Sequence, residues 1–352
     1  MERSLRRDRE AMGHRHRKAG LPAAVVGALL LAACAPMGSG DGQTTMRLSL
    51  NQAENHPSFI ALDNWSTYMA ENSEEVRIDV FPNETLGAQA EALQLVSTGI
   101  ADMAIVSGTQ LENLNEDFLV FNMPRVFDDV EHQMQVIHDP QITGELYASL
   151  EESNNITVLG GFTQGARSVY STEGPVHTPE DLDGDKIRVQ ESELNVAMAQ
   201  ALGGAGTPMA FGELYTGLQS GVVDAAENNE VSYYTQGHYE VAPYWSYTNH
   251  LVGLDYLIIN TEVLNSLSDA ERAVFEEGWA ATHVEHAELW GELTEEAIAG
   301  AEAGGAAFNE VDEAAFDDAL GGLAEDFITT PTQQELYDAA RAAAQPSGSG
   351  DE

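Results

Sequence analysis

Residues 207–229 read TPMAFGELYTGLQSGVVDAAENN. Near the end of this stretch, the run Val222–Ala226 is short and apolar, which predicts a β-strand. Glu227 and Asn228 follow that run directly. In open α/β sheets, ligands bind at the carboxyl ends of the strands. The stretch therefore predicts one strand of an α/β sheet, with polar side chains at the edge where such sheets bind small molecules.

The segments around this stretch alternate between the patterns of helices and strands. Residues 194–202 carry apolar side chains at helical spacing, and Gly203 and Gly204 stop that helix. Further along, Ser268 and Glu271 form a capping box that opens a long helix with one apolar stripe. The alternation predicts an α/β architecture. The other predicted strands cover residues 46–50, 76–80, 101–106, 156–161, 186–190 and 256–260.

The composition fits a large folded protein with a very acidic surface. The chain has 352 residues, 43 % of them hydrophobic, which is enough for two α/β domains with cores of their own. It carries 15 Lys and Arg against 58 Asp and Glu, and residues 34–352 keep only 8 of the basic residues but 55 of the acids. Such a surface repels nucleic acid and anionic lipid. The near absence of lysine beside this acid excess predicts a halophilic protein that works in high salt; a merely acidic surface is the alternative.

The first residues have the pattern of an export signal. A basic segment, His14–Lys18, precedes the apolar run Leu21–Ala33, which is too short for a membrane-spanning helix. We therefore predict a signal peptide over residues 1–33. The run ends Leu-Ala-Ala-Cys, which resembles a bacterial lipobox and predicts lipidation of Cys34, with cleavage after Ala35 as the alternative. Since Cys34 is the only cysteine, the chain has no intrachain disulfide and no thiolate metal site.

Several motifs occur in a fixed order along the chain. They are FPNETLG at residues 81–87, GIADM at 99–103, GARS at 165–168, TPEDLDGDKIRV at 178–189, and the stretch quoted first. Together they resemble the solute-binding subunits of TRAP transporters, the tripartite ATP-independent periplasmic family. The resemblance covers roughly residues 46–335, and several ordered motifs are far more specific than one short pattern.

The resemblance implies a two-lobed periplasmic-binding-protein fold with a ligand cleft and a long domain-spanning helix. It places lobe I at residues 46–163 plus 254–290, and lobe II at 164–253 plus 291–335. Residues 34–45 are then a flexible tether and 336–352 a C-terminal tail. The implied protein is a periplasmic receptor with no enzymatic activity and no cofactor. Its implied partners are the small and large permease subunits in the membrane, which use an ion gradient.

The resemblance also implies that two arginines hold the carboxylate of a small organic anion. Arg188 matches the principal anchor of the family, and Arg167 matches the second cation. A guanidinium suits this role because its planar fork binds a carboxylate through two parallel hydrogen bonds. The alternative for each arginine is an ion pair with one of the many acids of this chain.

Other residues match positions that contact the ligand in the family. Asn228 would donate a hydrogen bond, unless it only forms a turn. Glu227 would bind the ligand or brace an arginine, and Phe211 would pack on the ligand or in the core. In lobe I, Asn51 and Glu91 match positions that contact ligand hydroxyls or amines. Weaker candidates for the rim of the cleft are Ser107, Tyr234, His250 and Tyr256.

The substrate is predicted less sharply than the family. The motifs around residues 165–168 and 224–229 look most like members that bind sugar acids such as uronates and aldonates, and a simpler carboxylate or sulfonate remains open. One alternative is a binder of an amine or a zwitterion, in which Glu91 and Glu227 would hold the ammonium group. Another is a secreted α/β enzyme, although the chain has no Gly-x-Ser-x-Gly motif and no metal or dinucleotide motif.

Overall fold

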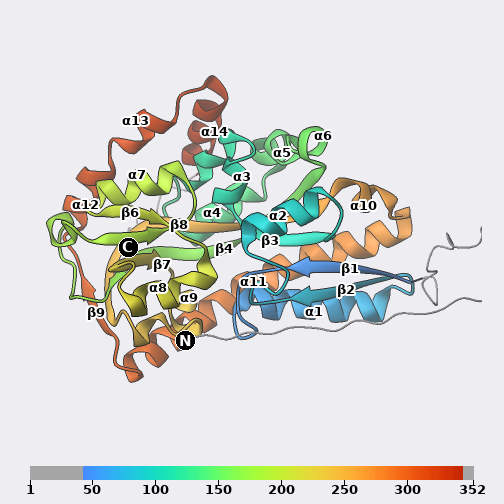
Figure 1. Ribbon diagram of the computed structural model, residues 1–352. Coiled ribbons are helices and arrows are strands. Elements are labelled where there is room, and N and C mark those ends of the chain that lie inside the picture. The colour runs from blue at the N-terminus through green and yellow to red at the C-terminus, as the bar shows by residue number, and fades with distance from the viewer. Residues whose placement is uncertain (1–42, 344–352) are drawn as a thin grey trace, which may run out of the picture. The chain divides into compact units, whose positions relative to one another are not determined.

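The computed structural model of the chain describes residues 43–343 (Figure 1). The predicted signal peptide, most of the tether and Cys34 lie outside this range. Within it, the strands form one sheet in the order β2-β1-β3-β8-β4-β7-β5-β6, and β9 pairs with β8. The strands are β1 (Thr44–Ser49), β2 (Val76–Phe81), β3 (Met103–Ser107), β4 (Ile156–Ser171), β5 (Lys186–Val189), β6 (Ala205–Pro208), β7 (Ala225–Asn228), β8 (Tyr244–Asn260) and β9 (Ala307–Glu310).

Two long antiparallel strands connect the two parts of this sheet. β4 and β8 pair from Ile156 and Asn260 at one end to Ser171 and Tyr244 at the other. β1, β2 and β3 extend the sheet beside the final residues of β8, whereas β7, β5 and β6 extend it beside the final residues of β4. The sheet thus consists of two halves joined by β4 and β8. We call the part built on β1–β3 the first lobe and the part built on β5–β7 the second lobe.

Fourteen α-helices surround the sheet in residues 43–343. The predicted long helix is α11, which spans 35 residues and begins at the Ser268 cap, where Ser268 and Glu271 exchange both capping hydrogen bonds. The helices are α1 (Pro57–Asn72), α2 (Gln89–Ser97), α3 (Gly108–Glu112), α4 (Val130–Ile137), α5 (Pro140–Ala148), α6 (Glu151–Asn154), α7 (Glu193–Ala201), α8 (Leu214–Ser220), α9 (Glu230–Thr235), α10 (Thr261–Ser266), α11 (Asp269–Ala303), α12 (Glu313–Leu320), α13 (Leu323–Phe327) and α14 (Pro331–Ala342).

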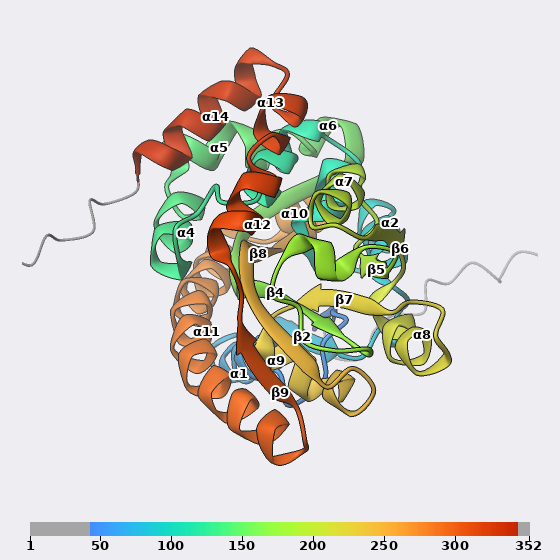
Figure 2. The ribbon, with the colours of Figure 1, turned by 90° about the vertical axis from the view of Figure 1, so that its left-hand side faces the viewer.

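Helix α11 packs against both lobes, along α1 of the first and α9 of the second (Figure 2). Its apolar stripe includes Phe275 and Trp279, which join a buried cluster with Trp65 of α1. Gly278 faces the same tryptophan, and a Cβ there would come within 2.5 Å of the Trp65 indole nitrogen. A glycine is required for this close approach of the two helices. A separate cluster around Tyr170, Tyr233 and Trp245 fills the second lobe.

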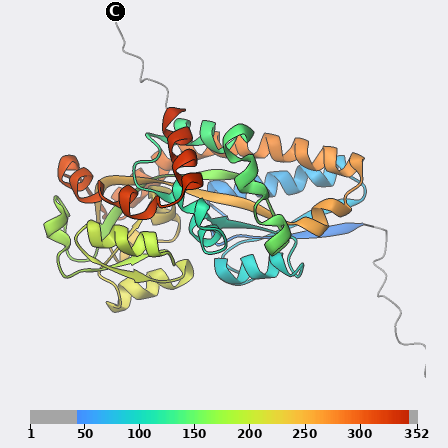
Figure 3. The same cartoon turned by 90° about the horizontal axis from the view of Figure 1, so that it is seen from above.

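Three details of the predicted elements are wrong. Strand β7 begins at Ala225, because Val222 is exposed in the turn after α8. Strands β4 and β8 are far longer than the predicted runs 156–161 and 256–260. Residues 336–342 belong to α14 and are not part of a tail: this helix buries Leu336 and Ala340 against α5 and the 3₁₀ helix η1 (Glu116–Asn122) of the first lobe (Figures 2 and 3).

Among the described residues, no helix combines the length and the apolar character that a membrane crossing requires.

Candidate functional site

Arg188 lies on β5, between β7 and β6, and is only 2 % exposed. Its Nε donates to the Met209 carbonyl oxygen at 2.9 Å. Within residues 43–343, its two terminal nitrogens have no hydrogen-bond partner, and no carboxylate oxygen lies within 4 Å of the guanidinium. Burial lowers the pKa of Arg188, whereas Glu227 and Glu84 act in the opposite direction from a greater distance. The structure thus holds a buried cation whose hydrogen-bonding end is open.

Arg188 lines a small cavity between the lobes, which leaves only about 20 Å³ for the centres of water-sized molecules. The ring of Phe211 flanks the guanidinium, with 5.8 Å between the ring centre and the guanidinium carbon. The first lobe contributes Asn51, Glu84, Ala88, Gln89 and Gln110 to the wall, and the second contributes Arg188, Gln190, Glu191, Met209, Ala210 and Phe211.

Asn51 presents a hydrogen-bond acceptor with no partner in the described part of the chain. It lies at the end of β1, is 9 % exposed, and its buried Oδ1 accepts no hydrogen bond. A buried acceptor left in this state costs about 1–3 kcal/mol. A hydroxyl donor in the cavity would remove that cost, so Asn51 fits the predicted contact with a ligand hydroxyl.

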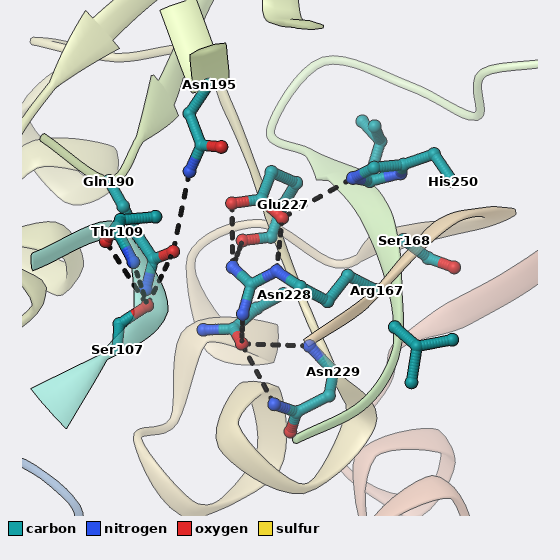
Figure 4. A network of polar contacts seen from close by, with 12 residues as sticks. Ser107, Thr109, Arg167, Ser168, Gln190, Asn195, Glu227, Asn228, Asn229 and His250 are labelled. Carbon is teal, nitrogen blue, oxygen red and sulfur yellow. Dashed lines mark hydrogen bonds and ion pairs between the residues drawn. The ribbon is translucent and has the colours of Figure 1, made fainter. Parts of the chain in front are cut away.

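Arg167 is held by an acid of its own (Figure 4). Its Nε and Nη2 donate to the two carboxylate oxygens of Glu227 at 2.5 and 2.7 Å, and Nη2 also donates to the Glu227 carbonyl oxygen at 2.9 Å. Burial on its own would raise the pKa of Glu227, but Arg167 and the nearby His250 hold it at about 2. The carboxylate therefore stays charged and braces Arg167, which is the second of the two roles considered for Glu227.

Asn228 connects Arg167 to the end of β7. Its Oδ1 accepts from Arg167 Nη1 at 3.0 Å and from the Asn229 backbone and side-chain nitrogens at 2.9 and 3.1 Å (Figure 4). The side-chain NH₂ of Asn228 has no partner among residues 43–343, and one N–H of Arg167 Nη1 is left over from its five donors. Both groups remain available as donors, so Asn228 is more than a turn residue.

The structure does not bring Glu91 into the cavity wall. Glu91 is exposed, and its Oε2 accepts from the Ala88 backbone nitrogen at 2.9 Å at the start of α2. Two of the weaker candidates pack against other parts of the protein: Tyr256 is buried and Tyr234 is half-buried. Tyr256 packs edge-on against Phe118 and Tyr147. Tyr234 lies against α11 at Gly300.

Contacts between the lobes close the cavity. Ser107 Oγ donates to Gln190 Oε1 at 3.2 Å (Figure 4), and Asn113 Nδ2 donates to the Glu191 carbonyl oxygen at 3.1 Å. Gln190 and Glu191 follow β5 directly, so these bonds tie the strand that carries Arg188 to the helix after β3. The structure therefore has its two lobes in contact across the cleft.

The sequence prediction missed several residues of the cavity wall. Glu84 lies within the motif at residues 81–87 and could have been selected from it, whereas Gln89, Gln110 and Gln190 carry no signal beyond their polarity. It also missed Asp255, which lies inside an apolar run and accepts from Gln52 Nε2 at 2.8 Å. Asp255 is 4 % exposed, and no cation lies within 4 Å of its carboxylate among the described residues.

Comparison with known proteins identifies this arrangement. The family model described as "Bacterial extracellular solute-binding protein, family 7" matches residues 48–330. The chain belongs to this family. It is a TRAP-type solute-binding protein, and both the family resemblance and the two-lobed α/β fold predicted from the sequence are confirmed.

Relatives of this TRAP-type protein match over most of their length. A solute-binding protein of Chromohalobacter salexigens is 34 % identical over 78 % of this chain and 81 % of its own. The crystal structure of a TRAP periplasmic solute-binding protein of Anaerococcus prevotii, with bound D-glucuronate, matches with a TM-score of 0.83 and 35 % identity, over 86 % and 98 % of the two chains. A relative from Sulfitobacter sp., with bound β-D-galacturonate, matches with a TM-score of 0.80 and 30 % identity, over 85 % and 100 %.

Proposed function

We propose that this TRAP-type receptor captures a uronate, with D-glucuronate and D-galacturonate as the first candidates. The observation that carries this proposal is Arg188, a buried guanidinium that has no acidic partner among residues 43–343, in a chain of 58 acids. Nearly every other cation after residue 33 pairs with a carboxylate: Arg47, Arg125, Arg167, Lys186, Arg272 and Arg341. An anion from outside the chain would satisfy Arg188.

The other side chains of the cavity wall suit a polyhydroxylated molecule. Asn51, Gln110 and Gln190 supply amide groups that both donate and accept, and the Asn51 acceptor has no partner among the described residues. Phe211 offers an apolar face beside the guanidinium. A sugar acid matches this set, because its carboxylate takes the fork of Arg188 while its hydroxyls meet the amides. The proposed site is Arg188, Asn51 and Phe211, with Asn228 and Arg167 as further donors.

Titration calorimetry tests the ligand directly. The purified protein, freed of bound ligand by mild unfolding and refolding, is titrated with D-glucuronate, D-galacturonate, D-gluconate, D-glucose and succinate. We expect tight binding of at least one uronate, no binding of glucose, which lacks the carboxylate, and weak binding of succinate, which lacks the hydroxyls. Binding of glucose equal to that of the uronates would contradict the role of Arg188.

An amine or zwitterionic solute is the alternative ligand. Both acids that would hold its ammonium group have partners inside the chain, since Glu227 binds Arg167 and Glu91 caps α2. Because both carboxylates are already paired inside the chain, the structure supports an acidic ligand over an amine ligand. A thermal-shift screen in which only amines raise the melting temperature of the protein would instead favour the amine ligand.

We infer that the protein works as a periplasmic receptor with the lobe boundaries expected from the family, except that α14 belongs with the first lobe, and that it is anchored through lipid on Cys34. It would release the bound acid unchanged to the small and large permease subunits. Incubation with the uronate for hours, followed by NMR of the released sugar, should return the starting compound.

Mass spectrometry of the mature N-terminus should show a lipidated Cys34, and a first residue at Pro36 would disprove the anchor.

A further inference from the structure

Glu84 reaches from the first lobe to the second lobe across the cavity. Its Oε1 accepts a hydrogen bond from the Gly212 N–H at 3.3 Å, and Gly212 directly follows Phe211. Glu84 and Arg188 line the same cavity. A carboxylate of the protein therefore stands in the small space into which the open end of Arg188 points.

The backbone of Glu84 has a conformation that side chains rarely adopt. Its φ is 55°, and Asn83 before it has a φ of 56°. Hydrogen bonds hold this turn, since the Glu84 N–H donates to the Leu50 carbonyl oxygen at 3.2 Å and the Gly87 N–H donates to the Glu84 carbonyl oxygen at 2.8 Å. Glycine would take this conformation without strain. A strained glutamate at the wall of a binding cavity points to a role for its side chain.

The second lobe fixes the position of this carboxylate. A Cβ on Gly212 would collide with Glu84 Oε2, so the carboxylate packs directly on the Gly212 backbone. The charged groups around Glu84 are Arg188, which attracts it, and Glu213 and Glu91, which repel it. Burial raises the pKa of Glu84, whereas the Gly212 hydrogen bond and Arg188 act in the opposite direction.

We propose that Glu84 makes the cavity selective for sugar acids with one carboxylate over sugar acids with two. This inference rests on the proposed function. One ligand carboxylate pairs with Arg188, and because Glu84 lines the same small cavity, any second carboxylate lies close to Glu84. Two like charges roughly 8 Å apart in a partly buried site repel enough to weaken binding on the order of tenfold or more.

The test compares a uronate with the aldaric acid that has the same carbon skeleton and a carboxylate at both ends. D-glucuronate and D-glucarate, or D-galacturonate and galactarate, are titrated at pH 8 into the wild type and into Glu84→Gln. We expect the wild type to prefer the uronate by about tenfold or more. Glu84→Gln should reduce that preference to roughly threefold or less, mainly because the diacid binds more tightly.

Two further variants separate the position of the charge from the net charge. Gly212→Ala keeps the net charge, but its Cβ displaces the Glu84 carboxylate from the Gly212 backbone. This variant should therefore also reduce the preference for the uronate over the aldarate. Asp79→Asn removes one negative charge from an exposed position of β2 and should keep the wild-type preference.

Each outcome gives a definite answer. The inference is wrong if the wild type binds the aldarate as tightly as the uronate, or if Glu84→Gln leaves the preference unchanged. It is also wrong if Asp79→Asn narrows the preference as much as Glu84→Gln, since a long-range charge effect would then suffice. Binding of neither acid by the folded wild type overturns the proposed function, and the inference with it.

Discussion

The carboxylate of Glu227 binds the guanidinium of Arg167 through two parallel hydrogen bonds, at 2.5 Å between Oε2 and Nε and 2.7 Å between Oε1 and Nη2. Arg188 lies two strands away, on β5, and has no such partner among the described residues. The two arginines that the sequence predicted as a pair of anchors are therefore not equivalent. Arg167 is neutralised by Glu227, whereas the guanidinium of Arg188 is open to an anionic ligand.

Substitution of Arg188 should weaken uronate binding severely. Arg188→Ala leaves the ligand carboxylate desolvated without a partner, which should cost roughly 2–5 kcal/mol, or about 30- to several-thousand-fold in affinity. Arg188→Lys keeps the charge but loses the planar fork, so its loss should be smaller but measurable. Titration calorimetry gives both values. Arg47→Ala, which removes an exposed arginine of β1, is the control and should bind normally. Wild-type affinity in a folded Arg188→Ala protein would exclude this anchor.

Substitution of Glu227 should affect the fold more than Arg188→Ala does. Glu227→Gln leaves the buried Arg167 without its counter-ion, and breaking a buried pair by removing one partner costs about 3–5 kcal/mol. Urea denaturation at pH 7 measures the loss. The Arg167–Glu227 pair is also expected to fail in acid: the pKa of Glu227 is about 2, below its usual value near 4.5, so the stabilisation is present above that usual value and is lost as the pH falls toward 2. An equal stability of wild type and Glu227→Gln at pH 7 would show that the pair contributes nothing.

Asp255 should destabilise the protein at neutral pH. Burial raises its pKa from 3.8 to about 6, against the effects of Gln52 and Arg167. The fold therefore favours the protonated form, and stability falls as the pH rises from about 4 through 6, by roughly 3 kcal/mol in total. Asp255→Asn should raise the melting temperature at pH 7.5 and change it little at pH 4. The same increase at both pH values, or none at pH 7.5, would contradict this account.

Salt should stabilise the protein over a wide range. Residues 34–352 carry 55 acids against 8 basic residues, so mutual repulsion among the unpaired carboxylates is large at low ionic strength. The melting temperature should rise as sodium chloride increases from near zero toward about 1 M, where the Debye length falls to about 3 Å. Sucrose at matched osmolality is the control, because it leaves the charges unscreened. A flat salt profile would remove the basis for expecting a halophilic protein.

The sequence predicted two of the polar residues that line the cavity, but it did not predict the full set of residues that form the wall. Arg188 and Asn51 could be selected because they match ligand-contacting positions of the family that the sequence motifs resemble. Gln110 and Gln190 could not be found, since what brings them together is the approach of the two lobes and not any spacing along the chain. Glu91 was misplaced for a local reason: its carboxylate satisfies the start of α2.

The full length of β4 and β8 could not be predicted because polar residues and glycines interrupt their apolar patterns. Gly160, Gly161, Thr163, Gln164 and Gly165 interrupt the apolar pattern of β4, and its register with β8 shifts at three places there. Such irregularities look like loops in a sequence, although tertiary pairing holds them in the sheet. Helix α14 was missed because about half of its residues are polar, and the face that it buries includes the polar Gln333 beside Leu336 and Ala340.

The place of β8 between β3 and β4 constrains when this chain can fold during synthesis. The two halves of the sheet cannot be joined until residues 244–260 have been made, because β8 is the strand through which β3 reaches β4. A nascent chain of 240 residues contains β1 to β3 and β4 to β7, two groups of strands that only β8 joins. The long-range pairing of one late strand thus delays the completion of the two-lobed sheet until nearly three quarters of the polypeptide has been made.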